Sequence, residues 1–202
     1  AKIIPAPHEK GYGLTLGQSL RRILLSSIRG AAVTAVKFDQ VLHEFSSIPG
    51  VAEDVVEITL NVKQLAVKLL EPGEKKLELV VKGPCEVTAS MITEIANVEI
   101  LNPDLIICNI NKDVDFKMTL TVNEGKGYLP SAQNRKSDNP IGLIPVDSIF
   151  SPIKNVSYKV ENTRVGQDTD YDKLTMNIET NGTIIPEDAI ALAGGECSII
   201  KK

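Results

Sequence analysis

Apolar side chains recur at intervals of three and four residues in the segment that follows the first ten residues. Thr15 stands where an N-cap is expected, and Gly30 follows the last apolar position, where a helix often ends. The pattern predicts an amphipathic helix of about 13 to 15 residues. Arg21 and Arg22 then point about 100° apart, so at most one of them faces solvent completely. The apolar face consists of Leu16, Leu20, Ile23, Leu24 and Ile28.

Alternating apolar and polar positions in the next part of the chain predict strands. Ala31–Phe38 and Val41–Phe45 are separated by two polar residues and predict a hairpin. Val51–Leu65 fits both the alternation of a strand and one face of a helix, so the pattern leaves its structure open. A second hairpin is expected where Ala66–Leu70 and Leu77–Val81 flank a turn that contains proline and glycine.

The stretch Cys85–Asn123 is a succession of short β-rich runs with polar or proline-bearing turns between them, which predicts a mainly antiparallel arrangement. The expected strands of this stretch are Val87–Ala89, Val98–Leu101, Leu105–Ile110 and Phe116–Asn123.

Ser131–Pro140 consists of small or polar residues, apart from one alanine, and is expected to form a mobile surface loop.

The last third of the chain predicts a hairpin and a short helix. Ser157–Val165 and Tyr171–Glu179 alternate like paired strands. Pro186 suits the first turn of a helix, where its missing N–H costs nothing, and acids follow it at the positive end of the helix dipole. Gly194 and Gly195 are expected to end this helix after about two turns.

Size and charge narrow the class of protein. The chain has 202 residues, enough for one domain or two small ones, and its 43% hydrophobic and 24% charged content is ordinary for a globular protein. It contains no apolar run long enough to span a bilayer and no secretory signal, so we expect no membrane association and a cytoplasmic location. The net charge of −4 argues against direct DNA binding by this chain.

Side chains typical of catalysis or metal binding are present, but their spacing matches no known site. Cys85, Cys108 and Cys197 lack CxxC spacing and are expected to be small buried or half-buried thiols. His8 and His43 stand in no hydrolase or metalloprotease motif. The glycines between residues 11 and 17 lack the lysine of a phosphate-binding loop, and are expected to provide backbone freedom at a turn. We therefore expect no catalytic residue, metal or cofactor in this chain.

Several sequence blocks together resemble one family. Gly11–Ser27 reads GYGLTLGQSLRRILLSS, and it is followed in the same order by Val41–Val67, Gly125–Ser131 and Pro140–Ile190, which includes PIGLIPVDSIFSP. These blocks are similar in order and spacing to the N-terminal domain of the bacterial and plastid RNA polymerase alpha subunit. The resemblance covers nearly the whole chain, and ordered separate blocks are more specific than any single motif.

The resemblance implies an α+β fold with two subdomains. Residues 1–30 together with 153–202 would form an α/β dimerisation subdomain built from both chain ends. Residues 31–152 would form an inserted, mainly antiparallel β subdomain. The family has a helix in Val51–Leu65, and on that basis we expect a helix there.

The resemblance also implies a function in transcription. The family is the non-catalytic assembly scaffold of DNA-directed RNA polymerase, a nucleotidyltransferase complex, located in the bacterial cytoplasm and nucleoid or in plastids. Two copies form a homodimer, which recruits the beta and beta-prime subunits. The expected dimer interface is the apolar helix face given above. The residues expected to bind the large subunits are Arg22, Leu25, Ser26, Lys63, Val146, Asp147 and Ser151.

Three alternatives remain open at this point. The apolar face of the first helix is about as well explained by packing within one chain as by a dimer interface. Arg22 fits either an interface anchor or a surface arginine paired with a nearby acid. The segment GGECSIIKK stands where the family has a longer helix, so the chain also fits a truncated or divergent relative that binds one large subunit without assembling an active polymerase.

Overall fold

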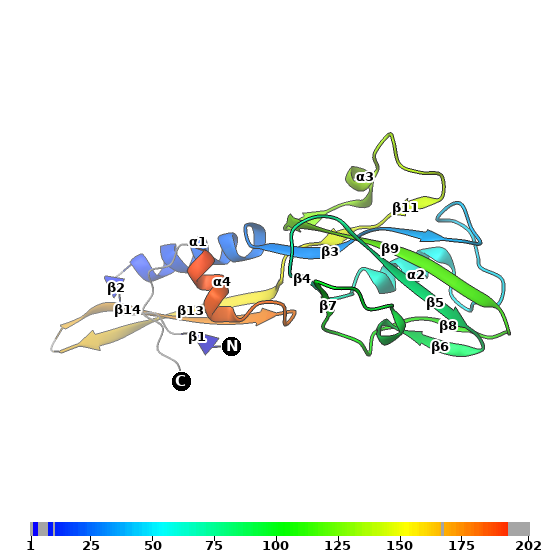
Figure 1. The fold of residues 1–202 in the computed structure, drawn as a ribbon. Coiled ribbons are helices and arrows are strands. Elements are labelled where there is room, and N and C mark those ends of the chain that lie inside the picture. The colour runs from blue at the N-terminus through cyan, green and yellow to red at the C-terminus, as the bar shows by residue number, and fades with distance from the viewer. Residues whose placement is uncertain (1, 4–7, 10, 167, 194–202) are drawn as a thin grey trace. The chain divides into compact units, whose positions relative to one another are not determined.

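The computed structural model describes residues 2–3, 8–9, 11–166 and 168–193 (Figure 1). The chain divides into two compact units. The first, here called the terminal unit, combines Ala1–Arg29 with Ser151–Lys202, and the second, the central unit, is Gly30–Phe150. Each unit has its own cluster of buried apolar side chains.

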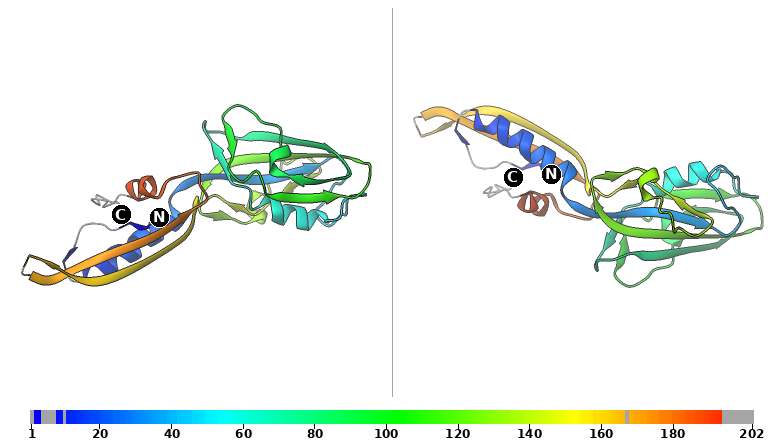
Figure 2. Two further views of the ribbon diagram at one scale, coloured as in Figure 1. Left: turned by 90° about the horizontal axis from the view of Figure 1, so that it is seen from below. Right: turned by 90° about the horizontal axis from the view of Figure 1, so that it is seen from above.

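The terminal unit packs helices against an antiparallel sheet. The sheet has the order β1-β14-β13, and β2 pairs with β14 as well. Figure 2 shows the long helix α1 lying along the hairpin of β13 and β14. Its elements are β1 (Lys2–Ile3), β2 (His8–Glu9), α1 (Tyr12–Ser26), β13 (Ile153–Val165), β14 (Asp168–Thr180) and α4 (Pro186–Leu192).

Helix α1 is confirmed, but both of its ends differ from the sequence prediction. Its N-cap is Gly11, in the left-handed region with φ of 86°, so the N-cap prediction for Thr15 is wrong. The helix ends at Ser26, with Ser27 as its C-cap. Ile28 therefore follows the helix, although its side chain is still buried with the helix's inner face.

Close approach, and not backbone freedom, explains two of the glycines in α1. A Cβ atom at Gly17 would lie 2.7 Å from the ring of Tyr158, and one at Gly13 would lie 2.9 Å from Cβ of Asp172. These glycines allow α1 to sit directly on β13 and β14. The predicted role in a turn holds only for Gly11, the one with positive φ.

The hairpin and the last helix follow the prediction closely. β13 and β14 pair in antiparallel fashion from Ile153↔Thr180 to Val165↔Asp168. β14 extends beyond its predicted strand at both ends, whereas β13 begins earlier than predicted and ends at Val165 as predicted. α4 begins at Pro186, with Glu187 and Asp188 in its first turn. Gly194 and Gly195, which were expected to end it, lie outside the described residues.

The central unit is built around a six-stranded antiparallel sheet. Its strand order is β5-β9-β3-β4-β7, with β11 on β3, and two-stranded sheets β10-β12 and β6-β8 accompany it. Its elements are β3 (Arg29–Phe38), α2 (Val55–Val62), β4 (Val67–Leu69), β5 (Lys75–Lys82), β6 (Cys85–Thr88), η1 (Ala89–Met91), β7 (Val98–Ile100), β8 (Ile106–Ile110), β9 (Asp115–Lys126), β10 (Tyr128–Leu129), α3 (Ser131–Asn134), β11 (Leu143–Pro145) and β12 (Ser148–Ile149).

Helix α2 resolves the segment that the pattern left open. Asp54 is its N-cap, and its carboxylate accepts a hydrogen bond from the N–H of Glu57 at 2.8 Å. Ile58 and Val62 are buried on its inner face. On the same helix, the side-chain amide of Asn61 donates to the carbonyl of Ile107 at 2.9 Å, which attaches α2 to β8.

Both hairpins predicted in this region are wrong. Val41–Phe45 is not a strand, and β3 is joined in the sheet by β9 and β4 instead. The strands on either side of the turn after Leu70 do form, but β4 pairs with β3 and β7 whereas β5 pairs with β9. Long-range pairing therefore prevails over the local turn signal. The segment Ser131–Pro140 contains the short helix α3 before it continues as a loop.

The predicted fold class is confirmed. The chain is α+β with antiparallel sheets, and the β-rich part is flanked by terminal segments that contain helices. Cys85 is half-buried and Cys108 is buried, as expected of these thiols, and burial raises the pKa of Cys108 to about 12. Cys197 lies outside the described residues.

Candidate functional site

A groove on the central unit brings together residues from four separate segments. Its volume is about 570 Å³. The outer face of α2 forms one wall, and α3 with the residues after it forms another. The groove is lined by Glu44, Phe45, Val56, Thr59, Leu60, Lys63, Ser131, Ala132, Arg135, Ile144, Pro145, Val146 and Asp147. Among these, Lys63, Val146 and Asp147 were predicted from the sequence to bind a large subunit.

Lys63 and Asp147 form the charged centre of the groove. Their Nζ and Oδ2 atoms are 3.7 Å apart, and Lys63 Nζ lies 5.4 Å from the centre of the Tyr128 ring. Oδ1 of Asp147 accepts a hydrogen bond from the N–H of Ser131 at 2.7 Å. The carboxylate thus holds the first residue of α3 and the lysine in one arrangement.

The ionised form of Asp147 is favoured in the folded protein. The hydrogen bond from the Ser131 N–H, followed by those from the Tyr128 and Ser131 side chains and the charge of Lys63, lowers its pKa below the ordinary value of 3.8, against the opposing effect of desolvation. Because the pKa of Asp147 is lower in the folded protein than in the unfolded chain, its ionised carboxylate stabilises the folded state. This contribution is complete above pH 3.8 and is lost as the pH falls through the pKa of Asp147 in the folded protein.

We expect acid to release Ser131 from the carboxylate. The amide resonance of Ser131 should titrate below pH 3.8, and its hydrogen exchange should accelerate relative to the intrinsic rate. Both effects should be absent from the Asp147→Asn variant, which has no carboxylate to protonate. An Ser131 amide that titrates identically in that variant would show that another group controls it.

Large apolar side chains lie exposed beside this charged pair. Phe45 is 82% exposed and Leu60 is 53% exposed, and both line the groove. Arg135 and Glu44 form a second ion pair across it, at 3.6 Å. Exposed apolar side chains with interspersed charges are typical of protein-binding surfaces. Phe45 was missed from the sequence because a strand, and not an exposed loop, was predicted there.

Val146 and Ser151 differ from the other predicted binding residues. Val146 is only 3% exposed and packs in the central core, so its side chain offers little surface to a partner. Ser151 belongs to the terminal unit. Its hydroxyl donates to the carbonyl of Ile153 and accepts from the N–H of the same residue, both at 3.3 Å.

On α1, the two adjacent arginines have different surroundings. Nε of Arg21 donates to the carbonyl of Val156 on β13 at 3.2 Å. The side chain of Arg22 is exposed and forms no hydrogen bond or ion pair within the part of the chain that the structure describes. Beside it, the hydroxyl of Ser26 donates to the carbonyl of Arg22 at 2.6 Å, and Leu25 is half-buried against the terminal core.

Most of the predicted dimer interface is the core of a single chain. Leu20, Leu24 and Ile28 are buried in the terminal core, and Leu24 is fully inaccessible. These three side chains are therefore covered within the single chain, and their part in a dimer interface stays a prediction. Leu16 is half-buried against the same core, whereas Ile23 is half-buried outside it. Among the described residues of the terminal unit, the exposed large apolar side chains are Tyr12, Leu14, Ile185 and Leu192.

The described residues contain no group of three or more His, Cys, Asp or Glu side chains placed to hold a metal ion. None of the described helices is both long and apolar enough to cross a bilayer.

Comparison with protein families identifies the central unit. Residues 36–151 match the model of a family described as the RNA polymerase Rpb3/RpoA insert domain. This match covers more than half of the chain and includes both Lys63 and Asp147 of the groove. The described terminal elements, with helices α1 and α4, flank the matched region on both sides. The chain therefore belongs to the Rpb3/RpoA family of RNA polymerase subunits.

Proposed function

We propose that this chain is a bacterial-type or plastid alpha subunit, a non-catalytic scaffold that forms a homodimer and recruits the beta and beta-prime subunits of RNA polymerase. Membership of the Rpb3/RpoA family supports a place in the polymerase. The bacterial or plastid assignment rests on the motif Gly11–Ser27, which precedes the matched residues. The observation that carries subunit recruitment is the exposed guanidinium of Arg22 within that motif, which pairs with no acid among the described residues.

The surroundings of Arg22 suit an interface anchor. Its guanidinium is not paired with a described acid, so a partner carboxylate can bind it without displacing an existing ion pair. Leu25 lies one turn away beside Ser26 and offers a partly exposed apolar contact. An arginine next to an apolar side chain is a frequent combination in the centre of protein interfaces.

The groove of the central unit supports a second contact with a large subunit. Lys63 and Asp147 offer charges of both signs, and the exposed apolar side chains beside them supply area to bury. Such a surface binds a partner through a hydrophobic centre with a polar rim. In this proposal Val146 positions Asp147, and Ser151 is a contact of the terminal unit.

Homodimerisation is assigned to the accessible apolar residues of the terminal unit. Accessible apolar side chains there include Leu14 and Ile23 on α1 and Ile185 and Leu192 at α4. Leu192 is 69% exposed in the single chain. Burial of such residues would supply the favourable free energy of association.

The test is the mass of the complex formed with a bacterial beta subunit. The chain is co-expressed with beta, and size-exclusion chromatography with light scattering gives the stoichiometry. We expect a species with two copies of the chain and one beta subunit. A one-to-one complex would contradict homodimerisation while supporting recruitment, as for a relative that binds one large subunit. A folded chain with no complex would contradict recruitment.

A further inference from the structure

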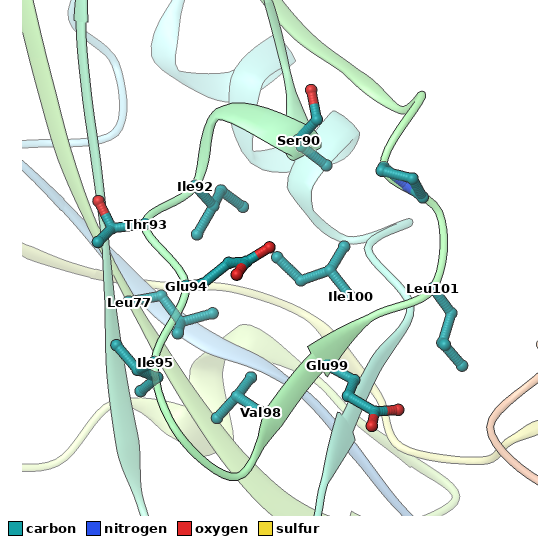
Figure 3. A pocket seen from close by; sticks show the side chains of 12 residues that line it. Leu77, Ser90, Ile92, Thr93, Glu94, Ile95, Val98, Glu99, Ile100 and Leu101 are labelled. Carbon is teal, nitrogen blue, oxygen red and sulfur yellow. The ribbon is translucent and has the colours of Figure 1, made fainter.

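A second opening in the central unit lies between the two edges of its main sheet. β5 and β7 are the end strands in the sheet order, and residues of both line this opening together with the segment that follows η1 (Figure 3). The opening has a volume of about 440 Å³. It is lined by Leu77, Ala89, Ser90, Ile92, Thr93, Glu94, Ile95, Val98, Glu99, Ile100, Leu101 and Pro103.

The edge of β7 that faces this opening has unused hydrogen-bonding groups. The N–H of Leu70 donates to the carbonyl of Asn97 at 2.8 Å, and the N–H of Leu101 donates to the carbonyl of Ala66 at 2.9 Å. Antiparallel ladders alternate, so the backbone groups of Val98 and Ile100 point away from β4. These N–H and C=O groups make no hydrogen bond within the described residues.

The β5 side of the opening is already paired. The N–H of Thr93 donates to the carbonyl of Glu78 at 2.8 Å, and Leu79 forms a bridge with Ile92. The segment after η1 therefore covers the edge of β5 and leaves β7 as the open one. An unpaired edge is a template for another strand. The short length of β7 and its charged residue, Glu99, limit uncontrolled pairing at this edge.

The charges at the opening are of one sign. Glu94 and Glu99 are the ionisable lining residues, and no lysine or arginine lines it. Figure 3 shows the Glu94 side chain extending across the opening toward Ile100. Glu99 is opposite Lys68 in the strand register, so Glu94 is the carboxylate with no cross-strand cation. This arrangement is complementary to a basic side chain on an incoming chain.

We propose that β7 binds an extended segment of another protein, which adds a strand to the sheet. The segment would pair with the backbone of Val98 and Ile100, insert an apolar side chain among Ile92, Ile95 and Ile100, and direct a lysine or arginine to Glu94. Backbone pairing supplies affinity in this mode of recognition, and the pocket and the charge supply specificity. The surface is separate from the groove at Lys63 and does not depend on the proposed role in polymerase assembly.

The probe is a fluorescein-labelled hexapeptide of alternating valine and lysine, titrated against the full chain by anisotropy. We expect saturable binding, with amide shift changes centred on Val98 and Ile100 in a ¹⁵N-labelled sample. Methylation of the peptide's backbone nitrogens on its pairing edge should abolish binding, because it removes donors that strand addition needs. A methylated peptide that binds as well as the parent would overturn the proposal.

Two charge-reversal variants distinguish binding of the peptide at this opening from general electrostatic attraction between a basic peptide and the acidic protein. Glu94→Lys should weaken binding by about tenfold, since it places like charges together. Glu86→Lys makes the same change of net charge at an exposed residue of β6 that does not line the opening, and should change the affinity by less than about twofold. Equal losses in the two variants would overturn the proposal.

The absence of saturable binding would also overturn it. So would concentration-dependent self-association of the chain alone with shift changes at Val98, because a second copy would then occupy this edge. Both glutamates are exposed, and circular dichroism spectra of both variants should match that of the parent.

Discussion

Replacing Asp172 with alanine is expected to lower the free energy of unfolding of the terminal unit by about 3 kcal/mol. This aspartate is 5% exposed, and its Oδ2 accepts hydrogen bonds from the N–H groups of Gly11 and Gly13, at 2.7 and 3.3 Å. α1 begins with a glycine that has no side chain to cap it. The carboxylate on β14 therefore caps the helix from the sheet, and alanine would leave the buried N–H of Gly13 and the partly buried N–H of Gly11 without this acceptor.

Urea denaturation followed by circular dichroism measures this effect, and hydrogen exchange of the α1 amides locates it. Asp172→Asn retains an acceptor without the charge and should cost less than the alanine variant. Glu179→Ala removes an exposed acid from the same strand and should change the stability by no more than about 0.5 kcal/mol. If Asp172→Ala and Glu179→Ala unfold at the same urea concentration, the capping role is refuted.

Arg22→Ala should weaken binding of a beta subunit by about 2 kcal/mol, or roughly thirtyfold, while the chain keeps its stability. The expected loss follows from the proposed role of this arginine as an anchor that is buried only in the complex. Its side chain is exposed and makes no described contact in the free chain, so its removal leaves the fold intact. A titration of the labelled chain with beta gives the affinity, and thermal unfolding gives the stability.

The neighbouring arginine provides the matched control. Arg21 donates to the carbonyl of Val156, so Arg21→Ala should lower the stability of the terminal unit by about 1 kcal/mol and leave the affinity for beta nearly unchanged. The two variants remove the same charge from adjacent positions. Equal affinities for beta after either substitution would exclude Arg22 as the anchor.

Local sequence patterns predicted those helices and strands whose type does not depend on the segments that they pack against. Helix α1 follows from the spacing of Leu16, Leu20 and Leu24, and the hairpin of β13 and β14 follows from alternation. The start of α1 could not be predicted in this way. It depends on Asp172, which is far away in the sequence and reaches the helix only when β14 is in place.

The pairing of strands and the properties of the surface were harder to predict than the positions of the helices and strands. The turn after Leu70 has every local feature of a hairpin, but its two strands find other partners in the sheet. The same limit applies to the site. Lys63 and Asp147 came from a family resemblance, and nothing local to either residue indicates the ion pair, the aromatic ring of Tyr128 beside it or the exposed Phe45.

The division of the terminal core between the two ends of the chain determines the order of events during synthesis. α1 leaves the ribosome early, but the side chains that cover Leu20 and Leu24 come from Ile153 onward. The whole central unit is translated in between, and it can fold first because it is continuous in sequence. Throughout that interval the apolar face of the nascent helix has no native partner. It is therefore the segment of this chain most exposed to premature aggregation and to capture by chaperones.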